Sequence, residues 1–306
     1  MRAQRAWSSP LARVLCSRLE ERDAVRAAER LADAARSKYG LLGPLDPRKF
    51  CTLLGVRCQS ERLQIDALLS SDEGGYLIRV NSAVSQVRQR FSISHELGHL
   101  YLFETTQLTG ALSHSVGSHS GAIASETESL CDAFAGSLLV PADEVFELTR
   151  KLGVTADLVS LLRSKYGISL DVCLRRIVGS GFWRCAIVLW DLKFDHGDLA
   201  ELVPVRFWRS SYLGEVPWPA PIRSDSASAQ PGTPLAAYSD RGASVGECLL
   251  RFGDEMLHVS CWSEPVHADR AYILTIILRE PQALNLLRTW HNAGRKPERQ
   301  ANLKFD

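Results

Sequence analysis

Residues 95–99 read His-Glu-Leu-Gly-His, and this pattern constrains the chain more than any other segment. In a helix, residues four apart lie on one face, separated by about 6 Å along the axis. The imidazoles of His95 and His99 can then reach one ion, and zinc favours neutral imidazole nitrogens. The side chain of Glu96 projects to a neighbouring position, where a carboxylate can act as general base during water attack on a peptide carbonyl. The pattern predicts a catalytic zinc site.

A histidine pair on a helix surface, without metal, is the structural alternative. Gly98 argues against it, because glycine costs about 1 kcal/mol inside a helix. A glycine is favoured there if a second element must approach the metal helix closely. We therefore expect a close helix contact at Gly98.

A catalytic zinc also needs a third protein ligand and an open position. The next predicted helix carries Glu128 and Asp132, which share one face because they are four residues apart. We expect Glu128 to be the third ligand and Asp132 to orient a ligand histidine through a hydrogen bond. His114 and His119, in the Gly/Ser-rich segment between the helices, are rival ligands. The stabiliser of the developing oxyanion is left open.

Two segments resemble the motifs of the ImmA/IrrE metallopeptidases. Residues 90–99, RFSISHELGH, are similar to R-F-[ST]-x-[AS]-H-E-[LI]-[GS]-H, and residues 128–141, ESLCDAFAGSLLVP, are similar to E-x-x-[AC]-[ND]-x-F-A-x-x-L-L-[MV]-P. The detailed resemblance covers about residues 75–145. It implies one zinc ion held by His95, His99 and Glu128. Val140 stands where Met is commoner, which we expect to change only core packing.

The resemblance also implies a function. It is that of a cytoplasmic bacterial endopeptidase that makes a limited cut in a helix-turn-helix transcriptional repressor and so releases stress, DNA-damage or antiphage defence genes. Members with a three-part order like this one respond to single-stranded DNA, which makes such DNA a candidate activator. Two other classes stay open: a DNA-binding regulator whose metal is structural, and an antitoxin-like protein that binds its partner without cutting it.

We predict an α+β chain of three parts. Residues 1–150 form a zincin-like metallopeptidase domain with the HExxH helix and a small antiparallel sheet. Residues 151–180 form a helix-turn-helix-like segment, and residues 181–306 form a β-rich, GAF-like sensor domain. Within the segment, two short helices meet at residues 165–169, and a plain helical hairpin is favoured over a DNA-reading element.

The periodicity of apolar residues and the turn residues predict the individual elements. Helices are expected at 11–39, 46–54, 87–103, 125–139 and 281–291. Strands are expected at 56–59, 63–69, 76–81, 182–190, 202–208, 247–252, 256–262 and 271–279. The Pro/Ser/Ala-rich stretch 214–244 is expected to be a long exposed loop.

The net charge of +1 excludes a globally basic protein that coats nucleic acid. The charge is nevertheless uneven, because residues 51–150 carry 6 basic and 12 acidic side chains. A nucleic-acid contact would most plausibly use the basic N-terminal helix or the tail residues Arg295, Lys296 and Arg299. Tryptophans of the C-terminal part could stack on bases, although burial in the core is the simpler reading. We expect no signal peptide and no membrane span.

Eight cysteines are scattered singly without a CxxC pair. This usage is typical of reduced thiols in a cytoplasmic protein. Cys58 and Cys51 precede strands that would border the cleft, so either thiolate could occupy the open position of the zinc and hold the enzyme latent. An ordinary buried cysteine is the simpler reading for both.

Overall fold

The computed structural model describes residues 7–107, 122–179, 184–194, 200–210, 216–223, 231–267, 271–278, 285 and 288–289. The chain divides into two compact units. The first comprises Met1–Glu144 with Leu162–Val172, and the second comprises Val145–Leu161 with Cys173–Asp306. The predicted division at residues 150 and 180 stays a prediction.

The helices of the first unit begin and end at local capping signals. They are α1 Pro10–Leu19, α2 Ala24–Lys38, α3 Pro47–Leu53, α4 Gln86–Thr106 and α5 Ala122–Leu139. The single helix predicted over residues 11–39 is wrong, because Glu20 adopts a left-handed conformation (φ 53°) that ends α1. The Asp23 carboxylate then accepts a hydrogen bond from the Val25 N–H and begins α2.

A 3-stranded sheet lies in the same unit, formed by β1 Arg57–Glu61, β2 Ala67–Asp72 and β3 Gly75–Asn81. The strand order is β1-β3-β2, with β2 antiparallel and β1 parallel to β3. The predicted antiparallel sheet is therefore wrong for β1. After β1 the chain passes to the far edge of the sheet, and the tight turn after β2 returns β3 into the middle.

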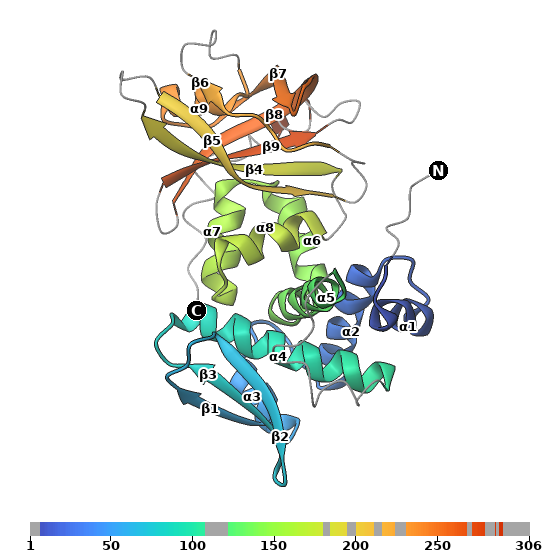
Figure 1. Cartoon of the computed structure of the whole chain (residues 1–306). Coiled ribbons are helices and arrows are strands. Elements are labelled where there is room, and N and C mark those ends of the chain that lie inside the picture. The colour runs from blue at the N-terminus through green and yellow to red at the C-terminus, as the bar shows by residue number, and fades with distance from the viewer. Residues whose placement is uncertain are drawn as a thin grey trace. The chain divides into compact units, whose positions relative to one another are not determined.

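Helix α4 is the central element of the first unit. It packs against α1, α2, α3, α5 and the strands β2 and β3, and Figure 1 shows it beside the sheet. Ile93, Leu97 and Leu102 on this helix are at most 1% exposed. Burial of apolar side chains on several sides fixes the rotation of α4, and with it the direction of its polar side chains.

The next helices are α6 Ala142–Leu152, α7 Ala156–Tyr166 and α8 Leu170–Gly179. The predicted pair of short helices joined at residues 165–169 is confirmed as α7 and α8. Gly167 supplies the left-handed turn with φ +58°, and the Ser169 hydroxyl accepts a hydrogen bond from the Val172 N–H. None of the helices in the described part of the chain is both long and apolar enough to cross a lipid bilayer.

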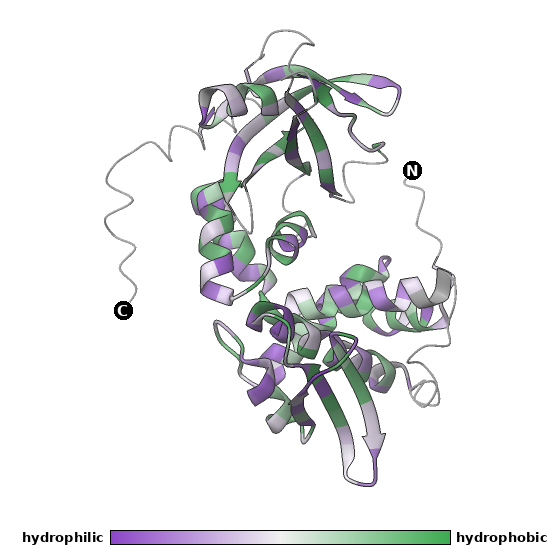
Figure 2. Ribbon diagram, turned by 60° about the vertical axis from the view of Figure 1, so that its left-hand side comes forward, coloured by the Kyte–Doolittle hydropathy of each residue, from purple (hydrophilic) through white to green (hydrophobic). Residues whose placement is uncertain are grey.

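A 6-stranded sheet dominates the second unit. Its strands are β4 Cys185–Phe194, β5 Ala200–Arg209, β6 Ile222–Arg223, β7 Ser244–Phe252, β8 Glu255–His267 and β9 Ala271–Leu278, in the order β6-β5-β4-β9-β8-β7. Each neighbouring pair is antiparallel. Buried and more exposed residues alternate along β7, and the ribbon of the sheet alternates in hydropathy (Figure 2). At the edge strand β7, one face therefore carries a core and the other meets water. In the centre of the sheet both faces are covered, because the consecutive residues Ile187, Val188 and Leu189 of β4 are all buried.

The stretch 214–244 is only partly the predicted loop. Its described residues contain β6 and a helix, α9 Pro234–Asp240, which contacts β7, β8 and β9. The Thr233 hydroxyl accepts a hydrogen bond from the Ala236 N–H, and Leu235 and Ala237 are buried. A Thr-Pro helix start was the signal that the overall Pro/Ser/Ala composition concealed. The predicted helix at 281–291 lies mostly outside the described residues.

Within the second unit, Glu264 of β8 holds the beginning of α7. Its carboxylate accepts a hydrogen bond from the Ala156 N–H, the first residue of that helix. Burial raises the pKa of Glu264 from 4.5 to about 7, despite the opposing effect of this hydrogen bond. The folded state thus binds a proton that the unfolded chain releases at lower pH.

We predict that the Glu264 proton makes stability depend on pH. Because its folded pKa is the higher one, its contribution is complete below about pH 4.5 and is lost as the pH rises through about 7. In Glu264→Gln, the change in the free energy of unfolding with pH should be smaller by on the order of 3 kcal/mol. Urea unfolding at a series of pH values measures this change. The exposed strand residue Glu247 provides a control, since Glu247→Gln should leave the pH profile unchanged. Parallel profiles for wild type and Glu264→Gln would contradict the prediction.

Candidate metal centre

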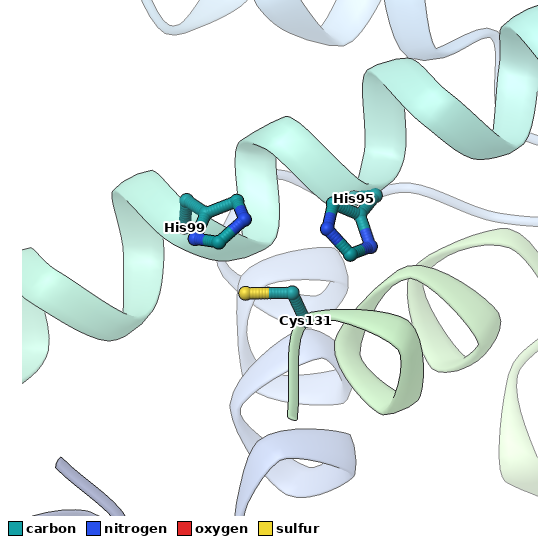
Figure 3. A group of neighbouring side chains, drawn as sticks. All are labelled: His95, His99 and Cys131. Carbon is teal, nitrogen blue, oxygen red and sulfur yellow. The ribbon is translucent and has the colours of Figure 1, made fainter. Parts of the chain in front are cut away.

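Helix α4 presents two histidines on one side. The Ser85 hydroxyl accepts a hydrogen bond from the Arg88 N–H at the start of the helix, and the helix then continues unbroken through both histidines. The ring centroids of His95 and His99 are 5.0 Å apart, and their side chains are 15% and 17% exposed. Figure 3 shows both imidazoles on the side of α4 that faces Cys131 of α5. The geometry is that expected for two nitrogen ligands of one ion.

Helix α5 brings two carboxylates to these imidazoles. Asp132 Oδ1 lies 2.9 Å from His95 Nδ1, and Glu128 Oε2 lies 3.0 Å from His95 Nε2. The other oxygen of Glu128 lies 3.5 Å from His99 Nε2. Glu128 thus stands where the two Nε2 atoms converge, whereas Asp132 contacts the opposite ring nitrogen of His95. Both carboxylates thus reach His95 from one face of α5, and their roles as ligand and as orienting partner stay predictions.

The charges of the site are tightly linked. Burial lowers the pKa of His95, but the hydrogen bonds to Asp132 and Glu128 outweigh it and bring the pKa to about 10. Burial and the positive charge of His95 lower the pKa of His99 to about 4. The hydrogen bond from His95 lowers the pKa of Glu128. The positive charge on His95 therefore favours the ionised form of Glu128.

Glu96 lies apart from this cluster of hydrogen bonds. Its Oε2 accepts a hydrogen bond of 3.0 Å from the backbone N–H of Leu69 on β2, a contact that the sequence did not reveal. Burial raises the pKa of Glu96 to about 7. A carboxylate with such a pKa is suited to accept a proton near neutral pH.

Gly98 is the point at which α4 and α5 touch. A Cβ atom at this position would lie 3.2 Å from both the Cα and the backbone O of Cys131, and 3.3 Å from a ring carbon of Phe134. The predicted close helix contact at Gly98 is thereby confirmed. It brings Glu128 and Asp132, which lie three residues before and one residue after Cys131, within reach of His95.

Cys131 offers a third donor of a different kind. Its Sγ and the ligand nitrogens of His95 and His99 lie within 4.8 Å of one another. The thiol is fully buried, and burial raises its pKa well above the usual value. The residues that the structure describes thus offer either a carboxylate or a sulfur as the third ligand.

Comparison with known proteins shows what this site is similar to. Residues 51–178 match the model of the IrrE N-terminal-like domain, Peptidase_M78. The chain is 29% identical over 103 residues to the radiation response metalloprotease IrrE of Deinococcus deserti. That match covers 34% of this chain and 36% of the relative, so the chain spans about a third of the relative's length.

Likeness in fold to a solved structure covers more of the chain than residues 51–178. A solved Mycobacterium tuberculosis transcriptional regulator matches 88% of this chain and 79% of its own, with a TM-score of 0.50 and 11% identity. This likeness concerns the fold alone. The histidines, Glu96 and both carboxylates of the centre all lie within the 51–178 match.

Several predicted site residues lie elsewhere or outside the described residues. Cys51 and Cys58 contact each other, and neither belongs to the described group formed by His95, His99 and Cys131. Their predicted latency role stays a prediction. The rival ligands and the basic tail residues fall outside the described part of the chain: His114, His119, Arg295, Lys296 and Arg299.

The tryptophans divide between core and surface. Trp190 and Trp262 are 1% and 3% exposed, and the Trp190 indole donates to the Thr275 hydroxyl at 2.9 Å. For these two residues the core reading is confirmed. Trp218 is 52% exposed and rests edge-on against Phe207.

We predict that Gly98→Val separates α4 from α5. The added side chain would meet the backbone of Cys131, so the free energy of unfolding should fall by about 1–3 kcal/mol and metal retention should fall with it. Urea unfolding and metal analysis after dialysis measure the two effects. Glu104→Val places the same side chain at an exposed position of α4 and should cost less than about 0.7 kcal/mol. Equal effects of the two substitutions would contradict the role given to Gly98.

Proposed function

We propose that the chain is a zinc-dependent endopeptidase that cuts a helix-turn-helix transcriptional repressor. The observation that carries the proposal is the convergence of His95 Nε2 and His99 Nε2 on the Glu128 carboxylate, at 3.0 and 3.5 Å. Two imidazoles and a carboxylate are a donor set of catalytic zinc sites. Asp132 supports the assignment because it holds the far nitrogen of His95, which orients the ring.

The metal ligands and the general base have separate chemical roles in the proposed reaction. When bound, zinc lowers the pKa of a water molecule and polarises the peptide carbonyl. His95, His99 and Glu128 would hold the ion. Glu96 Oε2 is occupied by the Leu69 N–H, so Oε1 is the atom that accepts the proton of the attacking water.

The position of Glu96 also favours a peptide substrate. β2 is an edge strand, and its Leu69 N–H points away from β3 toward Glu96. An extended peptide can add to such an edge through backbone hydrogen bonds. A scissile bond held along β2 would lie beside the general base.

The substrate and the signal are inferred from the charge of the domain and from the IrrE relative. The 12 acidic and 6 basic side chains of residues 51–150 favour a basic partner, such as a DNA-binding repressor. Cleavage would derepress stress, DNA-damage or antiphage defence genes, in line with the radiation response named for the IrrE relative. We infer a cytoplasmic enzyme whose second unit acts as a GAF-like sensor, with single-stranded DNA as the candidate activator.

Direct reading of duplex DNA by α7 and α8 is less well supported. A recognition helix needs several polar side chains on its exposed face. On α8, Arg175 is exposed but Arg176 is 3% exposed, and Val172, Leu174 and Ile177 are buried. This burial favours a packed hairpin. An antitoxin-like protein that binds the repressor without cutting it is the remaining alternative.

We predict that Glu96→Gln retains zinc but slows cleavage of the repressor by about 10²–10⁴-fold, because the general base is lost. The assay incubates the full chain with the repressor encoded beside its gene, with and without single-stranded DNA, and follows fragments on a gel. Glu104→Gln, an exposed change on the same helix, should cleave like the wild type.

The same gel separates the other functions. Cleavage by Glu96→Gln at the wild-type rate would refute the mechanism. Absence of cleavage together with stable repressor binding would favour the antitoxin-like protein. Sequence-specific duplex binding without any proteolysis would favour a regulator with a structural metal.

We predict that zinc binding depends on Glu128 and not on Cys131 as the third ligand. His99→Ala and Glu128→Gln should each weaken zinc binding by at least about 10-fold, whereas Cys131→Ala should retain one zinc per chain. Metal analysis after dialysis against a graded chelator measures the affinity. Loss of zinc from Cys131→Ala with full retention in Glu128→Gln would assign the thiolate instead.

A further inference from the structure

Two cysteines outside the metal centre lie side by side. Cys51 is on α3 and Cys58 is on β1, and the intervening turn is closed by the Val56 N–H donating to the Cys51 carbonyl at 2.9 Å. Gly55 takes φ +72° in this turn, and α3 packs against β1. The side chains of the two thiols interact with each other. This local unit therefore holds the two sulfurs close to one another.

A guanidinium faces the more exposed of the two thiols. Arg48 Nη1 donates to Cys58 Sγ at 3.6 Å, while Nη2 contacts Ser60 Oγ at 2.7 Å and Gln89 Oε1 at 3.1 Å. Cys58 is partly exposed, whereas Cys51 is fully buried. A reagent from solvent can reach Cys58, and Cys51 is placed behind it.

The electrostatics agree with this geometry. The hydrogen bond from Cys51 and the charge of Arg48 lower the pKa of Cys58 to about 7, against the effects of burial and of Asp46. The same hydrogen bond and burial raise the pKa of Cys51. At neutral pH a large fraction of Cys58 is therefore thiolate, while Cys51 stays a thiol.

We propose that Cys58 and Cys51 form a peroxide-reactive dithiol site, in which Cys58 is the attacked sulfur and Cys51 the resolving one. The proposal does not depend on the metal centre or on proteolysis. It rests on the contact between the two sulfurs, on the Arg48 guanidinium and on the partial exposure of Cys58.

The reaction balances with hydrogen peroxide as the oxidant. The Cys58 thiolate attacks one peroxide oxygen, the O–O bond breaks, and Cys58 becomes a sulfenic acid while hydroxide leaves. The Cys51 thiol then attacks the Cys58 sulfur. An S–S bond forms, the S–O bond breaks, and the oxygen leaves as water with the Cys51 proton. Overall, two thiols lose two electrons and two protons, and one peroxide becomes two waters.

Cys16 is a matched internal control. It is also partly exposed, but burial and the nearby Asp23 and Glu21 raise its pKa. The difference in thiolate content predicts that iodoacetamide at pH 7 modifies Cys58 at least about 10-fold faster than Cys16. In denaturant the ratio of the two rates should fall to about one, and Arg48→Met should lower the Cys58 rate in the folded chain.

Mass spectrometry tests the disulfide directly. The full chain is treated with hydrogen peroxide, its remaining thiols are alkylated, and it is digested with trypsin without reductant. We expect the tryptic peptides 50–57 and 58–62 to appear as one linked species, lighter by two hydrogen atoms than their sum. In Cys51→Ser, the linked species should vanish and dimedone should trap a sulfenic acid on Cys58.

The proposal fails on either of two results. One is an iodoacetamide rate for Cys58 no higher than that for Cys16 in the folded chain. The other is peroxide treatment that oxidises other cysteines without linking peptides 50–57 and 58–62.

Discussion

The contact between Gly98 and the backbone of Cys131 is the constraint on which the metal centre depends. At 3.2 Å from a would-be Cβ, the backbone of α5 lies closer to α4 than a side chain at Gly98 would fit without a shift. At this separation the carboxylate side chains on α5 reach the imidazoles of α4. Glu128 and Asp132 then contact opposite nitrogens of the same ring, at 3.0 and 2.9 Å. One glycine thus links helix packing to the chemistry of His95.

The site also shows how a buried charge is balanced. An ionised group inside a protein is costly unless an opposite charge pairs with it. The His95 side chain is only 15% exposed, and it is paired with the carboxylates of Glu128 and Asp132, whose side chains are 57% and 32% exposed. These contacts raise the pKa of His95 to about 10, while burial and the positive charge of His95 lower that of His99 to about 4. A divalent cation on the Nε2 side would supply positive charge to the Glu128 carboxylate, with both rings neutral.

Much of the site could be predicted because it depends on helical spacing. His95 and His99, and likewise Glu128 and Asp132, are four residues apart, so each pair shares a face whatever surrounds it. The features that sequence missed depend on distant contacts. The Leu69 N–H reaches Glu96 from β2, and the parallel pairing of β1 with β3 depends on the path taken between strands. Glu20 ends α1 in a left-handed conformation that glycine normally marks, so the cap residue Asp23 of the next helix was the signal of the break.

The contact between Cys51 and Cys58 also could not be predicted from their spacing in the sequence. Six residues separate them, a spacing typical of no thiol motif, and only the turn from α3 into β1 makes them neighbours. Arg48 joins this pair to the HExxH helix, because its other nitrogen donates to Gln89 of α4, six residues before His95. Since a disulfide carries no negative charge, its formation would remove the anionic partner of one Arg48 nitrogen while leaving the Gln89 contact of the other. Oxidation would therefore change the charge balance at the base of α4 without requiring either sulfur to reach the metal ligands.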